Sequence, residues 1–362
     1  MRRGLVALAC AGAFAAPADA ALPRSTVDRL DEARGPQIHV IYAVPADGAD
    51  RRLDESGALE GSVGSFQAWL AAETGGPNLR FDTYQGALDV SFFQLAATDA
   101  TVAAHGAFVR EAVEAELRGA GFNRPDRLYA VYYDGSSTFS CGGAFWPPQL
   151  HGNAVVMYLR GRPPGSVPCD SNGFAAASSP PTYWEYAMLH DILHGLGLAP
   201  TCAPHHHRAG HVSDFSNDLM WAGDQPWRFP AHLDLGRDDY YGHGRTDCAD
   251  LARSPYLTSN PPPPPVLAVS RLVAPVRARP DRLFDARLEV TLDGAAAVAG
   301  AARCTGRLGT RPLRALSTSF AASAARCRWR LPAGSKGKRF SATVRATVGG
   351  LSVGRSLSRI VR

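Results

Sequence analysis

Two hydrophobic periodicities divide the chain into parts of different kind. Before residue 260, short apolar runs predict strands at 37–45, 127–133 and 153–159, and 79–95 predicts two strands around a Gln-Gly turn. Apolar residues at helical spacing predict helices at 62–76 and 108–121. Because helices and strands are interspersed, we expect an α+β fold over residues 37–259.

Residues 266–362 alternate between apolar and polar positions with a period of two. Leu288, Val290 and Leu292 alternate with polar residues, and Phe340 and Val344 continue the same period further along the chain. Glycine-containing turns separate these runs. The pattern predicts a small all-β, immunoglobulin-like sandwich.

A proline tract separates the two parts. Asn260 is followed by five prolines, so residues 260–265 are expected to form an extended linker. Residues 266–362 contain 19 Lys/Arg and four Asp/Glu, a net charge of +15, whereas the preceding residues sum to −10. The basic part could bind an anionic cell-envelope polymer, but arginines on the solvated face of half-buried strands are the favoured explanation of the composition.

The beginning of the chain has the features of a secretory signal. Arg2 and Arg3 precede an apolar run, and Ala18-Asp19-Ala20 forms an A-x-A cleavage site, so residues 1–20 are expected to be a signal peptide. Residues 21–36 are then an N-terminal spacer. We expect no transmembrane segment and a secreted protein, extracellular or associated with the cell envelope.

Six cysteines remain outside the signal peptide, and an even number in an exported chain favours disulfides. Proximity along the chain favours three pairs: Cys141–Cys169, Cys202–Cys248 and Cys304–Cys327. None shows the C-x-x-C spacing of a thiolate zinc site.

The stretch HDILHGLG carries the candidate chemistry. Thr182 and Glu185 form a capping box, which predicts a helix that continues to Gly195. His190 and His194 are four residues apart, so their imidazoles lie on the same face of this helix, where both can bind one zinc ion. Core histidines that are hydrogen-bonded without a metal are the alternative.

This stretch, together with HVSDFSNDLMW downstream, resembles the metzincin zinc metalloproteases, which have an H-E-x-x-H-x-x-G-x-x-H helix and a later methionine turn. The resemblance covers about residues 181–223. It implies a mixed sheet with an active-site helix, and an exported Zn²⁺ endopeptidase in which three histidines hold the ion. Met220 corresponds to the methionine turn beneath it.

The third histidine of the family pattern would fall at position 200, which is a proline here. An inserted loop, TCAPHHHRAG, displaces the expected ligand. His211 lies nine residues before Met220, close to the family's spacing, and is the favoured third ligand. His205 and Asp214 remain as alternatives.

Asp191 stands where the family has its catalytic glutamate. Aspartate keeps the carboxylate but is one methylene shorter, and a general base must lie within hydrogen-bond reach of the proton it takes. A misplacement of about 1 Å can lower a rate on the order of 100-fold. Asp191 is therefore a catalytic candidate whose geometry is in question.

The sequence predicts a secreted zinc endopeptidase that hydrolyses peptide bonds of peptide or protein substrates through a metal-bound water, with Asp191 as the base. The alternative is a catalytically inactive zinc-bearing scaffold that binds the cell envelope through its basic tail. Nucleic acid is not an expected partner. Asp47, Asp50, Asp238 and Asp239 are weaker candidates for a calcium site, because no D-x-D-x-D-G loop is present.

Overall fold

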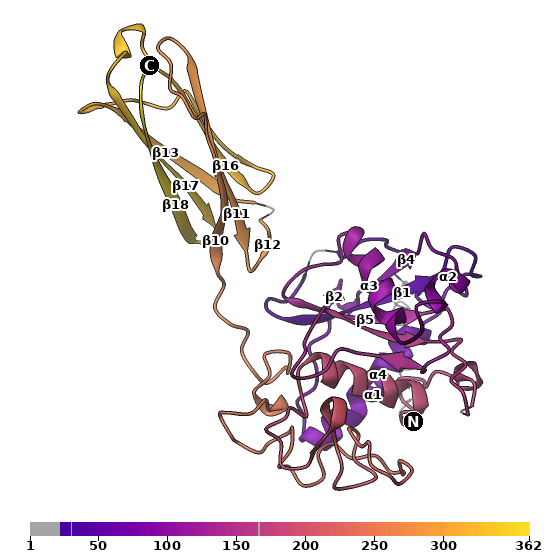
Figure 1. The fold of residues 1–362 in the computed structure, drawn as a ribbon. Coiled ribbons are helices and arrows are strands. Elements are labelled where there is room, and N and C mark those ends of the chain that lie inside the picture. Colours follow the sequence, from indigo (N-terminus) through magenta and orange to yellow (C-terminus); the bar gives the residue numbers. More distant parts are fainter. Residues whose placement is uncertain (1–21, 30, 166, 298) are drawn as a thin grey trace, which may run out of the picture.

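The computed structural model describes residues 22–29, 31–165, 167–297 and 299–362, and the expected signal peptide lies outside these ranges. Figure 1 shows two parts that are joined by a single extended segment. The N-terminal part contains helices and strands together, and the C-terminal part contains antiparallel sheets. The chain is therefore a mixed α+β protein, as the sequence predicts.

Five strands of the N-terminal part form one mixed sheet in the order β4-β1-β5-β7-β6. The first four strands are parallel, and β6 runs antiparallel to β7 at one edge. The elements of this part are β1 (Gln37–Val44), α1 (Ala58–Thr74), β2 (Thr83–Tyr84), β3 (Ala87–Leu88), β4 (Val90–Gln94), α2 (Asp99–Ala103), α3 (Val109–Gly119), β5 (Arg127–Tyr133), β6 (Gly142–Gly143), β7 (Ala154–Tyr158), α4 (Tyr183–Gly195), β8 (His206–His207) and β9 (His211–Val212).

Helices cover both faces of this sheet. Val40 and Tyr42 of β1 pack into one core with residues of α1 and α4, whereas Ile41 and Ala43 pack into a second core with residues of α2 and α3. All eight residues of β1 are buried. Strands buried on both faces are apolar throughout, which is why β1, β5 and β7 appear in the sequence as short apolar runs.

The predicted strands at 37–45, 127–133 and 153–159 correspond to β1, β5 and β7, and the predicted helices correspond to α1 and α3. Residues 79–95 hold three strands where two were expected. β2 and β3 form a hairpin whose turn residues Gln85 and Gly86 both have positive φ, and β4 follows as the edge strand of the main sheet.

The described residues between 22 and 36 do not form a free spacer but lie against the N-terminal part. The backbone N–H of Phe92 in β4 donates to the carbonyl of Ser25 at 2.7 Å. Arg24 pairs with Asp54 at 2.7 Å, and Arg124 pairs with Asp31 at 2.8 Å.

The C-terminal part consists of two antiparallel sheets around one core, which agrees with the expected β architecture. The sheets have the orders β10-β11-β16-β15, with β12 beside β11, and β14-β13-β17-β18. The ring of Phe340 contacts Phe284 and Trp329 of the opposite sheet, with centroid separations of 5.0 and 5.6 Å. The strands are β10 (Leu267–Val273), β11 (Leu283–Leu292), β12 (Ala295–Ala296), β13 (Ala301–Leu308), β14 (Arg311–Pro312), β15 (Ser317–Ala321), β16 (Ala324–Arg330), β17 (Arg339–Val348) and β18 (Leu351–Ile360).

Three disulfides join the pairs that proximity along the chain favours: Cys141–Cys169, Cys202–Cys248 and Cys304–Cys327. The third connects β13 to β16 and so links the two C-terminal sheets. Disulfides of this number indicate an oxidising compartment. Within the described ranges, none of the helices has the length and apolar character needed to cross a bilayer.

Candidate metal centre

Helix α4 begins at the predicted capping box. The backbone N–H of Thr182 donates to Glu185 Oε2 at 2.9 Å, and the Thr182 hydroxyl donates to the same oxygen at 2.6 Å. Glu185 is fully buried, and its Oε1 also accepts from the Ser62 hydroxyl of α1 at 2.7 Å. Glu185 therefore fixes both the start of α4 and its position against α1.

Three histidines converge at the far end of α4. His190 and His194 are one turn apart, with their Nε2 atoms at 2.9 Å, and His211 of β9 completes the cluster. Ring centroids are 4.5 Å apart for His190 and His194, 5.1 Å for His190 and His211, and 4.6 Å for His194 and His211. Of the candidates for the third position, the structure brings His211 to the helix pair, whereas His205 and Asp214 lie in a different cluster.

Backbone carbonyls orient two of the imidazoles. His190 Nδ1 lies 2.7 Å from the carbonyl of Leu219, and His211 Nδ1 lies 2.9 Å from the carbonyl of Arg208. A carbonyl accepts only, so each Nδ1 carries the proton and each Nε2 keeps its lone pair. This arrangement is the one that positions histidines for metal coordination.

The electrostatics also keep the rings neutral. Burial lowers the pKa of His190 to about 4, and the neighbouring His211 adds to this effect. Burial lowers the pKa of His194 well below its usual value, and burial likewise lowers that of His211. Neutral imidazole is the form that binds a metal.

The donor set fits a zinc ion. The edge of a tetrahedron of zinc ligands is about 3.3 Å, near the separation of the two Nε2 atoms of α4. Unlike the other two rings, His194 is not oriented by a carbonyl, because its Nδ1 is buried without a hydrogen-bond partner among the described residues. Imidazole nitrogen is one of the ligands that zinc takes in proteins, and three histidines hold the ion in some catalytic sites, so these three rings together could hold it.

Met220 lies in the segment that supports the cluster. Its carbonyl accepts from the backbone N–H of Val212, next to His211, at 2.9 Å, and the preceding carbonyl is the one that orients His190. The Met220 side chain is fully buried. The segment that resembles a methionine turn is thus bonded to the elements that present His190 and His211.

Asp191 lies beside the histidines, at the boundary of two cavities. Both cavities, of about 600 and 260 Å³, include Gly142, His190 and Asp191 in their walls. Burial raises the pKa of Asp191 to about 8, and no hydrogen bond within the described part of the chain offsets this effect. A Cβ on Gly142 of β6 would collide with Asp191 Oδ2, so the edge strand approaches the carboxylate closely only because it has glycine there.

The smaller cavity has an aromatic wall. Tyr183, Tyr186, Trp221 and Trp227 line it together with Leu219. The rings of Tyr186 and Trp227 meet edge to face, with centroids 5.5 Å apart. This cavity was not predicted from the sequence, because its residues come from the start of α4 and from a loop that follows Met220.

The four aspartates considered for calcium do not come together. Asp47 accepts the backbone N–H of Asp99 at 2.7 Å, and Asp50 pairs with Arg24. Asp238 and Asp239 instead belong to a cluster with His205 and Asp214. The calcium hypothesis for these four residues as one site is therefore wrong.

No family model matches the chain, and no curated protein matches it either.

Proposed function

We propose that the chain is a secreted, zinc-dependent endopeptidase of metzincin type. The observation that carries this proposal is the convergence of His190, His194 and His211, which line one cavity together with Asp191. The mixed sheet, with α4 beneath its antiparallel edge strand, supports the same reading. A zinc ion held by the three rings would supply Lewis acidity toward a water molecule and a peptide carbonyl.

Asp191 is the residue proposed to take the proton from the attacking water and to pass it to the leaving amine. Its exposed fraction is 8 %, and no hydrogen bond to a described side chain competes for its oxygens. The glycine at 142 allows β6 to lie directly against it. Edge strand β6 also offers backbone groups along which an extended peptide can lie.

The aromatic cavity indicates the substrate class. Its wall of Tyr183, Tyr186, Trp221 and Trp227 would take a large apolar side chain next to the bond that is cleaved. We therefore expect unfolded proteins or peptides with aromatic or long aliphatic residues to be cleaved best.

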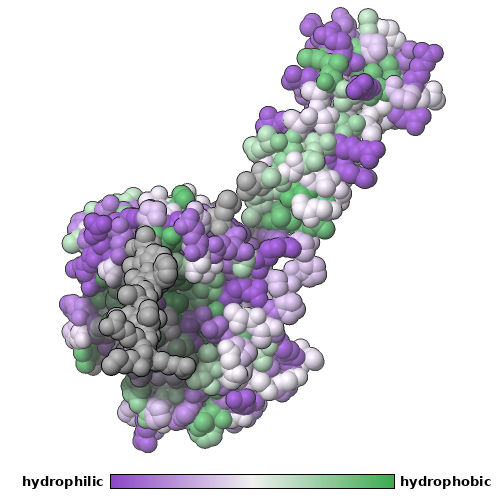
Figure 2. Space-filling view, turned by 180° about the vertical axis from the view of Figure 1, so that it is seen from behind, coloured by the Kyte–Doolittle hydropathy of each residue, from purple (hydrophilic) through white to green (hydrophobic). Residues whose placement is uncertain are grey.

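The C-terminal part is proposed to be an immunoglobulin-like sandwich with an accessory role. Of its 19 Lys/Arg, all but Arg359 are exposed, and Arg359 is half-buried. Hydrophilic residues cover much of this part in Figure 2. The exposure of these basic side chains supports both explanations, a solvated surface without a partner and attachment to an anionic envelope polymer.

Cleavage of an unfolded protein by the purified full chain tests the proposal. We expect zinc-dependent cleavage that falls about 100-fold or more in Asp191→Asn while bound zinc is unchanged. Asp224→Asn, which removes an exposed carboxylate outside the cavities, is the matched control. A zinc-loaded wild type that cleaves nothing would favour the inactive scaffold, and undiminished cleavage by Asp191→Asn would show that another group is the base.

A further inference from the structure

A second cluster of ligand-type side chains lies away from the three histidines. It consists of His205, Asp214, Asp238 and Asp239. His205 Nδ1 is 3.1 Å from Asp239, 3.7 Å from Asp214 and 3.7 Å from Asp238, measured to a carboxylate oxygen in each case. One ligand atom from each of the four residues lies within 4.8 Å of all the others.

Two segments of the chain bring these residues together. His205 and Asp214 flank the β8–β9 hairpin, whose second strand carries His211. Asp238 and Asp239 lie in a tight loop folded around the buried carboxylate of Asp234, which accepts the backbone N–H groups of residues 238–241. The backbone N–H of His205 also donates to Asp239 at 2.7 Å, which fixes the hairpin against this loop.

The cluster leaves negative charge without a partner. Asp214 Oδ1 and Asp238 Oδ1 are buried and have no hydrogen-bond partner among the described residues, and the Asp214 side chain is 10 % exposed. The described ion pairs of Asp214, Asp238 and Asp239 all go to His205, which supplies at most one positive charge to three carboxylates. The Asp238 side chain is 45 % exposed, but those of Asp214 and Asp239 are 10 % and 1 % exposed, and buried carboxylates are unfavourable unless a cation joins them.

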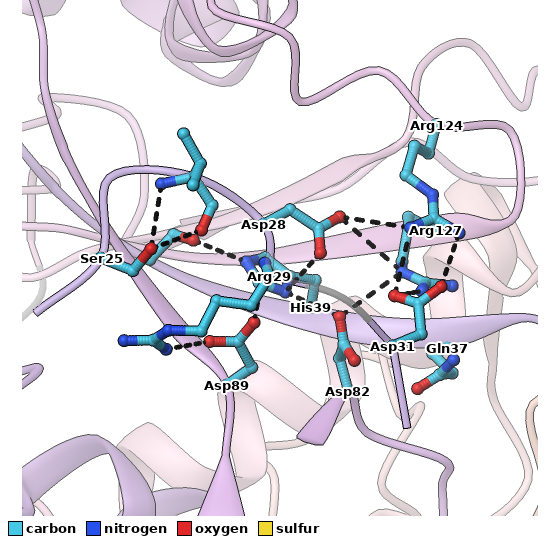
Figure 3. A network of polar contacts seen from close by, with 12 residues as sticks. Ser25, Asp28, Arg29, Asp31, Gln37, His39, Asp82, Asp89, Arg124 and Arg127 are labelled. Atoms are coloured by element: carbon cyan, nitrogen blue, oxygen red, sulfur yellow. Dashed lines mark hydrogen bonds and ion pairs between the residues drawn. The ribbon is translucent and has the colours of Figure 1, made fainter. Parts of the chain in front are cut away.

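The other acidic cluster of the N-terminal part shows the contrast (Figure 3). There Asp28, Asp82 and Asp89 surround His39, but Arg127 lies 3.6 Å from Asp82 and Arg29 pairs with Asp89. The arginines supply positive charge to the carboxylates of that network, although both oxygens of Asp28 and Oδ1 of Asp82 have no hydrogen-bond partner among the described residues. The cluster around His205 has no such arginine among its described ion pairs.

We propose that His205, Asp214, Asp238 and Asp239 form a second divalent-cation site, of the zinc class. The nitrogen–oxygen distances of 3.1 and 3.7 Å bracket the edge of about 3.3 Å expected between tetrahedral zinc ligands. An imidazole among carboxylates suits zinc, whereas calcium takes oxygen ligands alone. The assignment rests on this cluster only and does not depend on the proposed peptidase activity.

A metal at this site connects the β8–β9 hairpin to the loop at 234–241. The hairpin has only two residues in each strand, with His207 paired to His211, so its own backbone bonds constrain it weakly. A metal that binds the folded chain but not the unfolded chain would stabilise the hairpin and hold His211 in place. The second site is therefore structural and positions a ligand of the first.

Zinc content of the full chain, after chelation and reloading with Zn²⁺, tests the assignment. We expect about two ions per wild-type chain, and about one in both Asp214→Asn/Asp238→Asn and His190→Ala/His194→Ala. Asp224→Asn/Asp247→Asn removes the same charge from exposed positions and should keep both ions. If only the Asp214→Asn/Asp238→Asn variant loses zinc, this site is supported and the three-histidine site is rejected. The two proposals can therefore fail independently.

Thermal unfolding distinguishes a lost metal from a damaged fold. Without metal, Asp214→Asn/Asp238→Asn should unfold at the temperature of the wild type or above, because like charges have been removed. Added Zn²⁺ should raise the Tm of the wild type more than that of the variant, and Ca²⁺ should not substitute for it. If the double variant without metal is less stable than the metal-free wild type, the single variant Asp238→Asn, at a half-exposed position, is measured instead. Equal zinc content and equal zinc-induced shifts in wild type and variant would overturn the proposal.

Discussion

Asp191 and Gly142 show how the site depends on single atoms. The carboxylate is one methylene shorter than the glutamate of the metalloproteases that this stretch resembles, and the missing side chain at Gly142 is what allows β6 to approach it. A Cβ at position 142 would meet Asp191 Oδ2 first and Met157 Sδ next, at 3.1 Å. The backbone of Gly142 is extended, so alanine is otherwise tolerated there.

Gly142→Ala is therefore expected to displace the Asp191 carboxylate and to lower kcat/KM about 100-fold, with zinc content unchanged. Peptide cleavage and metal analysis of the same sample measure both quantities. Gly173→Ala, at a glycine whose added Cβ would meet nothing within 4 Å, is the control. Full activity in Gly142→Ala would mean that the position of Asp191 is not critical.

Asp218 should make the stability of the metal-free chain depend on pH. It is buried before Met220, accepts the Met220 N–H at 2.7 Å and the Tyr240 hydroxyl at 2.8 Å, and burial raises its pKa to about 7. Between about pH 4 and 7 the folded chain keeps a proton that the unfolded chain has released, so stability falls as pH rises. In chelator, we expect the Tm to fall between pH 5 and 8 and to fall less in Asp218→Asn. If the Tm of Asp218→Asn falls with pH as steeply as that of the wild type, other groups cause the effect.

Some of the residues of the candidate site could be predicted from the sequence, and others could not. His190 and His194 follow from helical spacing alone. The third ligand could not be fixed, because the inserted loop places His205, His211 and Asp214 within ten residues of one another, and only the fold separates them. The carbonyls of Leu219 and Arg208 orient the imidazoles, but the sequence could not show this, because every residue has a backbone carbonyl.

At the scale of elements, α4 was predictable because its start is chemically marked. The capping box is present, but Glu185 does more than cap the helix, because it also accepts from Ser62 of α1 and from the backbone N–H of Ala175. Strand β6, with only Gly142 and Gly143, has no sequence signature. The β-strands of the C-terminal part were predictable from their period of two.

Glu185→Ala should lower the free energy of unfolding by about 2–4 kcal/mol, because buried donors from three segments lose their acceptor. Thr182→Ala keeps the carboxylate and should cost only about 0.5–2 kcal/mol. Urea unfolding of both variants compares them directly. A smaller loss for Glu185→Ala than for Thr182→Ala would limit Glu185 to a capping role.

At the scale of the whole molecule, the two parts have separate hydrophobic cores. Core residues of the N-terminal part lie between 38 and 257, and those of the C-terminal part between 267 and 361. The proline tract predicts a domain boundary between these two cores, and that boundary remains a prediction. Nothing in the sequence indicated that the residues after 21 would lie against the N-terminal part, because those contacts are a backbone hydrogen bond to β4 and ion pairs to dispersed aspartates.

Removing the Cys304–Cys327 disulfide tests this separation. Cys304→Ser/Cys327→Ser should lower the stability of the C-terminal part by about 2–4 kcal/mol. Zinc content and peptide cleavage, which depend on the other core, should stay within about twofold of the wild type. Calorimetry and cleavage measured together check this, and a parallel loss of both would mean that the two parts fold as one unit.

Anomalous diffraction at the zinc edge, from crystals of the zinc-loaded full chain, tests the three-histidine site most directly. We expect an anomalous peak about 2.0–2.1 Å from Nε2 of His190, His194 and His211 at once. A zinc-loaded crystal with no peak between these three rings, or with His211 turned away from the ion, would contradict it.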